Sequence, residues 1–212
     1  MPGRPRILLG LGLLGVLVAI SLLGPLFTVA PEVFNTIDRL RPPGAPFWFG
    51  TDNYGRSVLA RSVAGGRISL LVGASVAVIS LFLGGAIGLA VGYFRRLDGP
   101  VMRVMDGIMA IPSVLLAIAL VSLTGASVTT VIGAIVVPEV PRMTRLVRGV
   151  VLTIRELAFV DAAVTSGTAA LAMLWRHILP NAVAPLIVQS TYVAASAILT
   201  ESALSFLGIG TP

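Results

Sequence analysis

Three carboxylates lie near or within apolar stretches of the sequence: Asp106, Glu139 and Glu201. Ionisable side chains are costly in lipid and usually face a cavity or a charged partner. Glu139 and Glu201 are therefore candidates for lining a transport pathway, and Glu201, deep in the last apolar stretch, is the better one. The structural alternatives are ion pairs of Asp106 with Arg103 and of Glu139 with Arg142, and a hydrogen bond of Glu201.

The residue types present exclude most catalytic chemistries for this chain acting alone. The sequence contains no lysine and no cysteine, so a Walker-type phosphate loop, a Schiff base, a thiol nucleophile and a thiolate metal site all lack their essential residue. His177 is the only histidine, and a single imidazole without cysteine partners makes a poor transition-metal site. No G-x-S-x-G nucleophile elbow is present. We expect no catalytic residue, no metal and no cofactor on this chain.

The composition requires a membrane. Apolar residues make up 56% of the chain and charged residues 11%, whereas soluble domains carry roughly 25% charged residues. Much of the surface must therefore face a lipid bilayer. The net charge of +6 does not indicate nucleic-acid binding, because the arginines are spread between apolar runs and are not clustered with aromatic residues.

Five stretches are apolar enough to cross a bilayer core of about 30 Å, which needs roughly 20 residues. A cytoplasmic N-terminus would put ten arginines inside and five in the outer loop, in the direction of the positive-inside rule. We therefore predict an all-α polytopic transmembrane helical bundle, with an uncleaved first span or, alternatively, a signal peptide. The predicted regions are a cytoplasmic segment 1–6, a span 7–29, an outer loop 31–67, and a region 68–212 with spans at 68–94, 103–123, 128–146 and 181–207.

Three local patterns have mainly structural explanations. Residues Gly50 to Arg56 read Gly-Thr-Asp-Asn-Tyr-Gly-Arg, a composition typical of a turn, and we expect structure here rather than substrate contact. Pro112 is expected inside the third span, and Pro138 and Pro141 are expected to interrupt the fourth. The second span carries glycines at close spacing, which predicts a tightly packed partner helix; these are Gly84, Gly85, Gly88 and Gly92.

A stretch from about Arg148 to His177 is too polar to span, and residues 156–180 have a helical pattern. A helix through Asp161, Ala162 and Ala163 should break at Gly167, where a missing Cβ permits the turn. A second short helix should follow and end at Pro180. Its apolar face consists of Leu171, Leu174 and Trp175, at spacings of three and four. An exposed apolar face of this kind needs a partner surface; the alternative is a solvated amphipathic loop.

This segment resembles the EAA loop of ATP-binding-cassette importer permeases. The resemblance rests on Asp161-Ala162-Ala163, on Gly167 after three further residues, and on the ending Arg-His-Ile-Leu-Pro-Asn, which resembles the version in dipeptide, oligopeptide and nickel permeases. Asp161 stands where the family usually has glutamate, and His177 where many members have isoleucine. The resemblance implies a cytoplasmic helix-turn-helix that docks on an ATPase subunit. The residues it assigns to coupling are Asp161, Ala162, Ala163, Gly167, Leu171, Leu174, Trp175, His177, Leu179 and Pro180.

Other motifs narrow the resemblance to the C-type peptide permeases. Residues 49–56 resemble their F-G-T-D-x-x-G-R signature, residues 66–73 their following stretch, and residues 201–208 their fifth-span ending. The resemblance covers nearly the whole chain from about residue 7. Such permeases continue into a sixth span, whereas this sequence ends at Pro212, so a fragment or a truncated product is expected.

The resemblance implies a non-catalytic transport subunit in a bacterial or archaeal inner membrane. Its expected partners are a second permease subunit, two cytoplasmic ATPase subunits that use ATP, an extracytoplasmic substrate-binding protein and the lipid bilayer, with no nucleic acid. The expected substrates are peptides, or a nickel chelate or related small solute. The main alternative is a secondary transporter or channel driven by an ion gradient through the three carboxylates, and a membrane-embedded enzyme is a weaker one.

Overall fold

The computed structural model describes residues 4–28 and 30–210. Val29, the end of the predicted first span, lies outside the described residues, as do residues 1–3 of the N-terminal segment and the last two residues. The chain divides into two units, 1–71 and 72–212, which we describe separately. Within the described ranges all regular elements are helices, with one isolated bridge between Thr51 and Ser57, so the all-α prediction is confirmed.

The first unit contains α1 (Arg4–Leu23), two short 3-10 helices (Gly24–Leu26 and Thr36–Asp38), an irregular loop and the beginning of α2 (Val58–Tyr93). Helix α2 begins at Val58 rather than at Ile68, because Ser57 supplies an N-cap. Its hydroxyl oxygen accepts a hydrogen bond from the backbone N–H of Ala60 at 3.4 Å. The stretch expected to end the outer loop is therefore helical.

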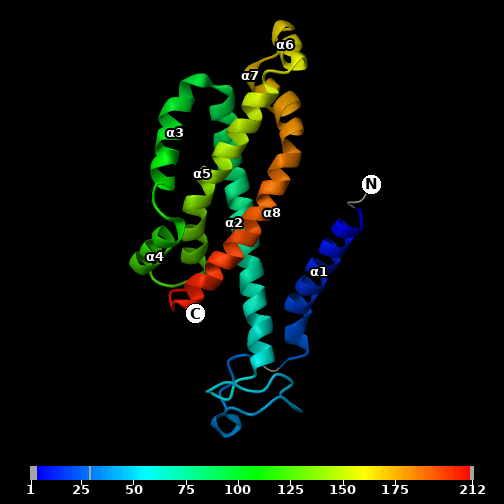
Figure 1. Ribbon diagram of the computed structural model, residues 1–212, viewed down its shortest axis with the longest axis vertical. Helices are drawn as coiled ribbons and strands as arrows, with labels where there is room; N and C mark the ends of the chain where they lie inside the picture. The colour runs from blue at the N-terminus through cyan, green and yellow to red at the C-terminus, as the bar shows by residue number, and fades with distance from the viewer. Residues whose placement is uncertain (1–3, 29, 211–212) are drawn as a thin grey trace. The chain divides into compact units, whose positions relative to one another are not determined.

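The second unit contains the rest of α2 and the remaining helices (Figure 1). Helix α5 is central, because it packs against α3, α4 and α8. Helix α6 and the short α7 form the elbow after α5. The bounds are α3 (Arg95–Met109), α4 (Ser113–Thr124), α5 (Val128–Ile154), α6 (Ala158–Thr165), α7 (Ala170–Met173), the π-helical turn η3 (Leu174–Ile178) and α8 (Leu179–Phe206).

The third predicted span is broken. The expected single helix across 103–123 is wrong, because α3 and α4 meet at an angle of 82°. Pro112 lies between them, and the residue before a proline avoids the helical region. Helix α3 also begins earlier than predicted, at Arg95, and has charged residues on one face, as a helix at a membrane boundary would.

The fourth predicted span is not interrupted. Helix α5 runs without a break through Pro138 and Pro141, so the expected interruption is wrong. Each proline removes one backbone donor, but both prolines are buried against neighbouring helices, and in membrane helices such packing tolerates the missing bond. The Ser127–Thr130 capping box fixes the start of the helix.

Three glycines of α2 allow it to lie directly against α5. A Cβ at Gly84 would come within 2.7 Å of Met143 Cβ, one at Gly88 within 2.6 Å of Val147 Cβ, and one at Gly92 within 2.6 Å of Val151 Cβ. The contacts advance by one helical turn on both helices, so α2 and α5 run in the same direction. The predicted close packing of the second span is therefore confirmed, and its partner is α5.

Length and apolar character identify three possible membrane spans among the described residues, or four if α3 and α4 form one bent span. The three are 7–26, 58–93 and 170–206. Helix α5 has 27 residues, which is long enough to cross, but it carries Glu139, Arg142, Arg145 and Arg148. These charged residues explain why composition alone does not reproduce the predicted five spans.

We predict that Gly88→Ala destabilises the second unit by about 1–3 kcal/mol, the usual cost of overpacking. The added methyl group would meet Val147 Cβ and the backbone carbonyl of Thr144, which cannot move independently of α5. Thermal unfolding in detergent measures the effect. Gly85→Ala is the matched control, since a Cβ there meets nothing within 4 Å and should leave the melting temperature equal or higher. Equal melting temperatures for the two variants would contradict the α2–α5 contact.

Candidate functional site

The turn in the elbow between α5 and α8 is formed by a glycine with a left-handed backbone conformation. Gly167 has φ +79°, and its N–H donates to the carbonyl of Val164 while the N–H of Thr168 donates to that of Ala163. These two bonds form a Schellman motif, in which glycine takes the position after the helix end because it has no Cβ. The predicted bend at Gly167 is confirmed.

Helix α6 presents an exposed surface. Asp161 and Ala162 are exposed, and so are the larger apolar side chains of Phe159 and Val164. Val160 is buried and anchors the helix to the rest of the second unit. The outer face of α6 therefore combines a carboxylate, small residues and apolar groups, as a docking helix would.

The second part of the elbow is continuous with the last membrane helix. The expected end at Pro180 is wrong, because helix runs from Ala170 to Phe206 through the π-helical turn. In this turn the N–H of Leu179 donates to the carbonyl of Leu174, five residues back. A wider turn tolerates a following proline because the normal four-residue pattern is already interrupted. His177 lies in this turn, half-buried, and the Asn181 side chain donates to its backbone carbonyl at 2.7 Å.

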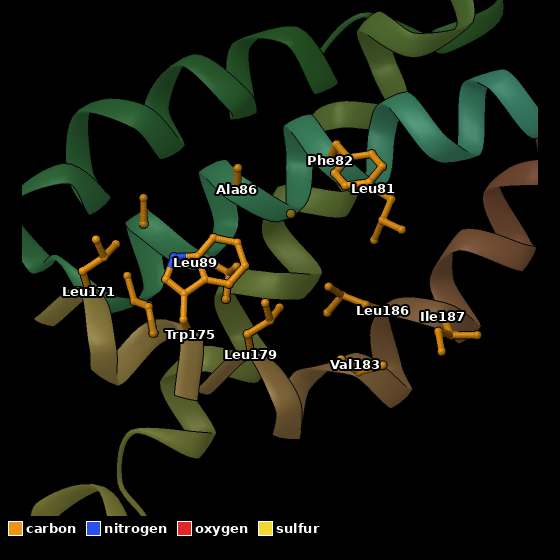
Figure 2. A pocket seen from close by; sticks show the side chains of 13 residues that line it. Leu81, Phe82, Ala86, Leu89, Leu171, Trp175, Leu179, Val183, Leu186 and Ile187 are labelled. Atoms are coloured by element: carbon orange, nitrogen blue, oxygen red, sulfur yellow. The ribbon is translucent and has the colours of Figure 1, made fainter. Parts of the chain in front are cut away.

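The structure separates the predicted coupling residues into two groups. Asp161, Ala162 and Ala163 lie on α6, whereas Leu171, Leu174, Trp175 and Leu179 line an apolar groove of about 430 Å³ together with α2. Figure 2 shows Leu171 and Trp175 on the same side of this groove as Leu179, opposite Leu89 and Ala86. The apolar face predicted for the second short helix therefore lines a groove with α2. It does not form one continuous surface with the exposed face of α6.

Three arginines of α5 form a ladder that holds α3 and the start of α4. Arg148 contacts both carboxylate oxygens of Asp98 at 2.5 and 2.6 Å, and Arg145 contacts Asp106 at 2.6 Å. Arg142 donates to Ser113 Oγ at 3.3 Å. We refer to Arg142, Arg145 and Arg148 as the arginine ladder. The expected partner of Asp106, Arg103, is wrong, since Asp106 pairs with Arg145 instead.

The two pathway candidates are both buried. Glu139 is 3% exposed and accepts a hydrogen bond from Arg142 at 2.6 Å, which confirms the ion pair considered for it. Its second oxygen, Oε2, has no hydrogen-bond partner among the described residues. Glu201 is 4% exposed and accepts a hydrogen bond from the Ser205 hydroxyl. Among the described residues, no group of three or more acidic or histidine side chains is placed to hold a metal ion.

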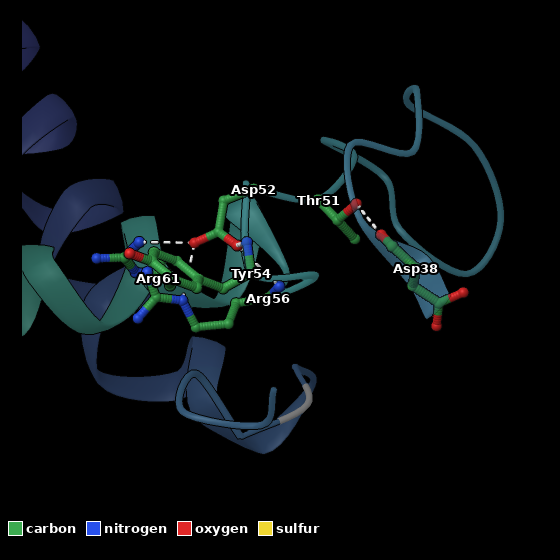
Figure 3. Close-up of polar contacts among 6 residues, drawn as sticks. All are labelled: Asp38, Thr51, Asp52, Tyr54, Arg56 and Arg61. Carbon is green, nitrogen blue, oxygen red and sulfur yellow. Dashed lines mark hydrogen bonds and ion pairs between the residues drawn. The ribbon is translucent and has the colours of Figure 1, made fainter. Parts of the chain in front are cut away.

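The turn at Gly50–Arg56 is organised around the Asp52 carboxylate (Figure 3). This group accepts hydrogen bonds from the backbone N–H groups of Tyr54 and Arg56, at 2.8 and 3.0 Å. It also accepts one hydrogen bond from the guanidinium group of Arg56 and one from that of Arg61. Burial acts to raise the pKa of Asp52, but these donors outweigh it and hold the pKa well below its usual range. The Arg56 guanidinium lies over the rings of Phe34 and Tyr54. The predicted turn is confirmed, and its charged side chains form hydrogen bonds with one another.

Sequence reasoning missed most of these long-range partners. Arg61 and Phe34 lie outside the predicted turn, and the partners of the arginine ladder are up to 50 residues away in sequence. A usable signal was present: arginines recur every three residues along α5, and an amphipathic segment with two aspartates precedes it.

Comparison with known proteins identifies the family. Residues 79–212 match the model of the "Binding-protein-dependent transport system inner membrane component" family. The chain belongs to this family. The permease is therefore a multi-helix inner-membrane component of a transport system that depends on a binding protein, and this membership does not support the alternative of an ion-gradient-driven transporter.

Curated relatives cover almost all of the permease. It is 51% identical over 209 residues to a probable peptide ABC transporter permease protein of Sinorhizobium fredii. The aligned region covers 99% of this chain and 72% of the relative. It is 40% identical over 205 residues to a dipeptide transport system permease protein of Alkalihalophilus pseudofirmus, with 96% and 67% covered. An oligopeptide transport system permease protein of Bacillus subtilis is 34% identical over 208 residues, with 97% and 68% covered.

We predict that Asp52→Asn loosens the loop between α1 and α2, because a neutral amide loses the ionic bonds to Arg56 and Arg61. Limited proteolysis should cut the variant loop several-fold faster, while Glu32→Gln, a change at an exposed carboxylate of the same loop, should leave the rate unchanged. Since the folded-state pKa is lowered, the Asp52 contribution is fully present above the unfolded value of about 3.9 and is lost only as the pH falls further, towards the folded pKa. A wild-type loop that loosens between pH 7 and pH 5 would contradict this role.

Proposed function

We propose that this permease is the membrane-spanning subunit of an ATP-driven importer of peptides, in which α6 docks on a cytoplasmic ATPase subunit. The observation that carries the proposal is the exposed outer face of α6, fixed between α5 and α8 by the Gly167 turn. Family membership in binding-protein-dependent transport and the peptide transport systems named for the relatives support a peptide as the substrate.

The docking argument follows from the chemistry of α6. Phe159 and Val164 are 41% and 53% exposed although the helix lies after the long α5 and outside the candidate membrane spans. Exposed apolar groups beside small residues favour close contact with a protein surface. Asp161, at the first turn of α6, adds a negative charge that a basic group on the ATPase would pair with.

The elbow can pass motion of an ATPase to the membrane region. Helix α6 follows α5 after three residues, and α5 is joined to α3 and α4 by the arginine ladder. On its other side the elbow continues directly into α8. A displacement of α6 would therefore move two membrane helices and the bent α3–α4 pair together, which is the kind of rigid-element shift that alternates access.

The other partners follow from the same proposal. A second permease subunit completes the translocation pathway, two ATPase subunits bind and hydrolyse ATP, and an extracytoplasmic binding protein delivers the peptide. This chain itself binds no cofactor and carries no catalytic residue. Glu139 and Glu201 are the pathway candidates, and the Arg142 side chain, which is 36% exposed, is the accessible part of the Glu139 ion pair.

We predict that Gly167→Val uncouples the importer. A Cβ in the left-handed region costs roughly 1–2 kcal/mol, and a β-branched residue is an outlier there, so the docking-competent elbow should be depleted about five- to thirtyfold. Co-purification of the ATPase subunits and peptide-stimulated ATP hydrolysis both measure this. Gly149→Val is the control, because Gly149 has no positive φ and a Cβ there meets nothing within 4 Å.

A second substitution separates docking from folding. Ala162→Trp adds a bulky ring to the exposed face of α6 and should leave the thermal stability of the isolated permease unchanged while it reduces ATPase co-purification. Unchanged co-purification and hydrolysis in both Gly167→Val and Ala162→Trp would refute the docking of α6.

A further inference from the structure

The apolar groove between α2 and the α7–α8 helix has no assigned occupant. One wall is formed by α2 from Leu81 to Ala90, and the other by residues of the elbow and α8 from Leu171 to Ile187. Figure 2 shows Trp175 beside Leu89 near one end and Phe82 and Ile187 near the other. Its volume of about 430 Å³ lies within the range of roughly 300–1,000 Å³ that small-molecule sites have.

The length and position of the groove fit one leaflet of a bilayer. Leu81 and Ala90 are nine residues apart, which corresponds to roughly 13 Å along a helix at 1.5 Å per residue. Half of a bilayer core is about 15 Å. The groove therefore extends about as far as one acyl-chain layer, whereas a packed transmembrane helix would need a surface along both leaflets.

Two arginines follow the α2 wall of the groove along the chain. On α2, Phe82, Ala86, Ala90 and Tyr93 share one face at helical spacing, and a second hollow lined by residues 93–97 follows directly beyond Ala90. This hollow includes the exposed Arg95 and Arg96.

Arg176 is a further exposed arginine at this end, next to Trp175 on the opposite wall. Within residues 4–28 and 30–210, Arg95, Arg96 and Arg176 have no carboxylate within ion-pair distance; the paired arginines are Arg41, Arg56, Arg61, Arg142, Arg145 and Arg148. An anion is therefore the complementary partner for this end.

Trp175 marks the boundary between the two regions. Its side chain is 63% exposed although it lines an apolar groove. Tryptophan is enriched at membrane–water interfaces, where its ring lies against lipid and its N–H meets the headgroup layer. Arginine-rich ends of membrane helices lie on the cytoplasmic side, so the groove opens into the inner leaflet.

We infer that this groove binds one anionic phospholipid of the inner leaflet, with an acyl chain between Ala86 and Val183 and a phosphate near Arg95, Arg96 and Arg176. Basic pockets on the cytoplasmic side of membrane helices bind anionic headgroups through such contacts. The lipid would fill the space between α2 and the elbow, so it would support the position from which α6 reaches its partner. This last consequence and the use of the importer complex in the test rest on the proposed function.

Native mass spectrometry of the importer complex extracted from membranes tests the inference. Phosphatidylglycerol and phosphatidylcholine with identical acyl chains are added separately, and lipid retention is measured. Wild-type complex should retain one phosphatidylglycerol in preference to phosphatidylcholine. Arg95→Gln with Arg96→Gln should reduce this preference by roughly fivefold for each arginine, while Arg103→Gln, an exposed arginine of α3 outside both hollows, should not.

Groove substitutions test the acyl-chain position. Ala86→Trp fills the groove and should abolish retention of either lipid, whereas Leu83→Trp, on a lipid-exposed part of α2 outside the lining, should retain phosphatidylglycerol. Equal retention of the two lipids by wild-type complex, or full retention by Ala86→Trp, would overturn the inference. So would disulfide crosslinking in native membranes between Leu89→Cys and single cysteines placed in the second permease subunit, since that would show a protein helix in the groove. Copurifying ATPase subunits confirm that the complex itself is intact in each case.

Discussion

The charged contacts between α5 and the preceding segment determine how the second unit is assembled. Three arginines at intervals of three residues lie along one side of α5, and their partners Ser113, Asp106 and Asp98 occur in the opposite order along the chain. This pairing fixes α3 antiparallel to α5 and places the bend at Pro112 beside Arg142. Near a membrane such pairs are screened less than on a soluble surface, and an unpaired arginine would be expensive. The broken span is therefore held in place by charge rather than by its own helical continuity.

Helix α5 is bound on another side by contacts of a different kind. The glycines of α2 allow backbone-to-backbone approach over three successive turns, and in lipid this packing replaces the hydrophobic effect as the force between helices. Ion pairs and close packing together make α5 a rigid connection. It leads from the bent α3–α4 pair to the elbow, so the proposed displacement of α6 would reach that pair without a loss of packing in between.

The elbow has two surfaces with different chemistry. Helix α6 turns a carboxylate, alanines and exposed apolar groups outward, while Leu171, Leu174 and Trp175 face α2 across the apolar groove. The Schellman turn at Gly167 separates the two surfaces, because it ends α6 within a single residue. The proposed protein docking on the first surface and the proposed lipid binding on the second are therefore compatible in one short segment.

The sequence by itself determined the features that depend on local composition. Low charge content requires a membrane, Gly167 must turn because only glycine adopts its backbone conformation without cost, and the Gly50–Arg56 turn follows from an aspartate bonding to its own backbone. Tertiary structure decided the rest. Pro112 separates two helices, whereas Pro138, Pro141 and Pro180 do not end theirs, since the effect of a lost N–H depends on whether neighbouring helices and turns accommodate it. The partner of Asp106 is 39 residues away in sequence, and the sequence did not indicate that the apolar face of the second short helix lines a groove with α2. Helical spacing identifies which side chains share a face, but only the packed bundle determines what that face meets.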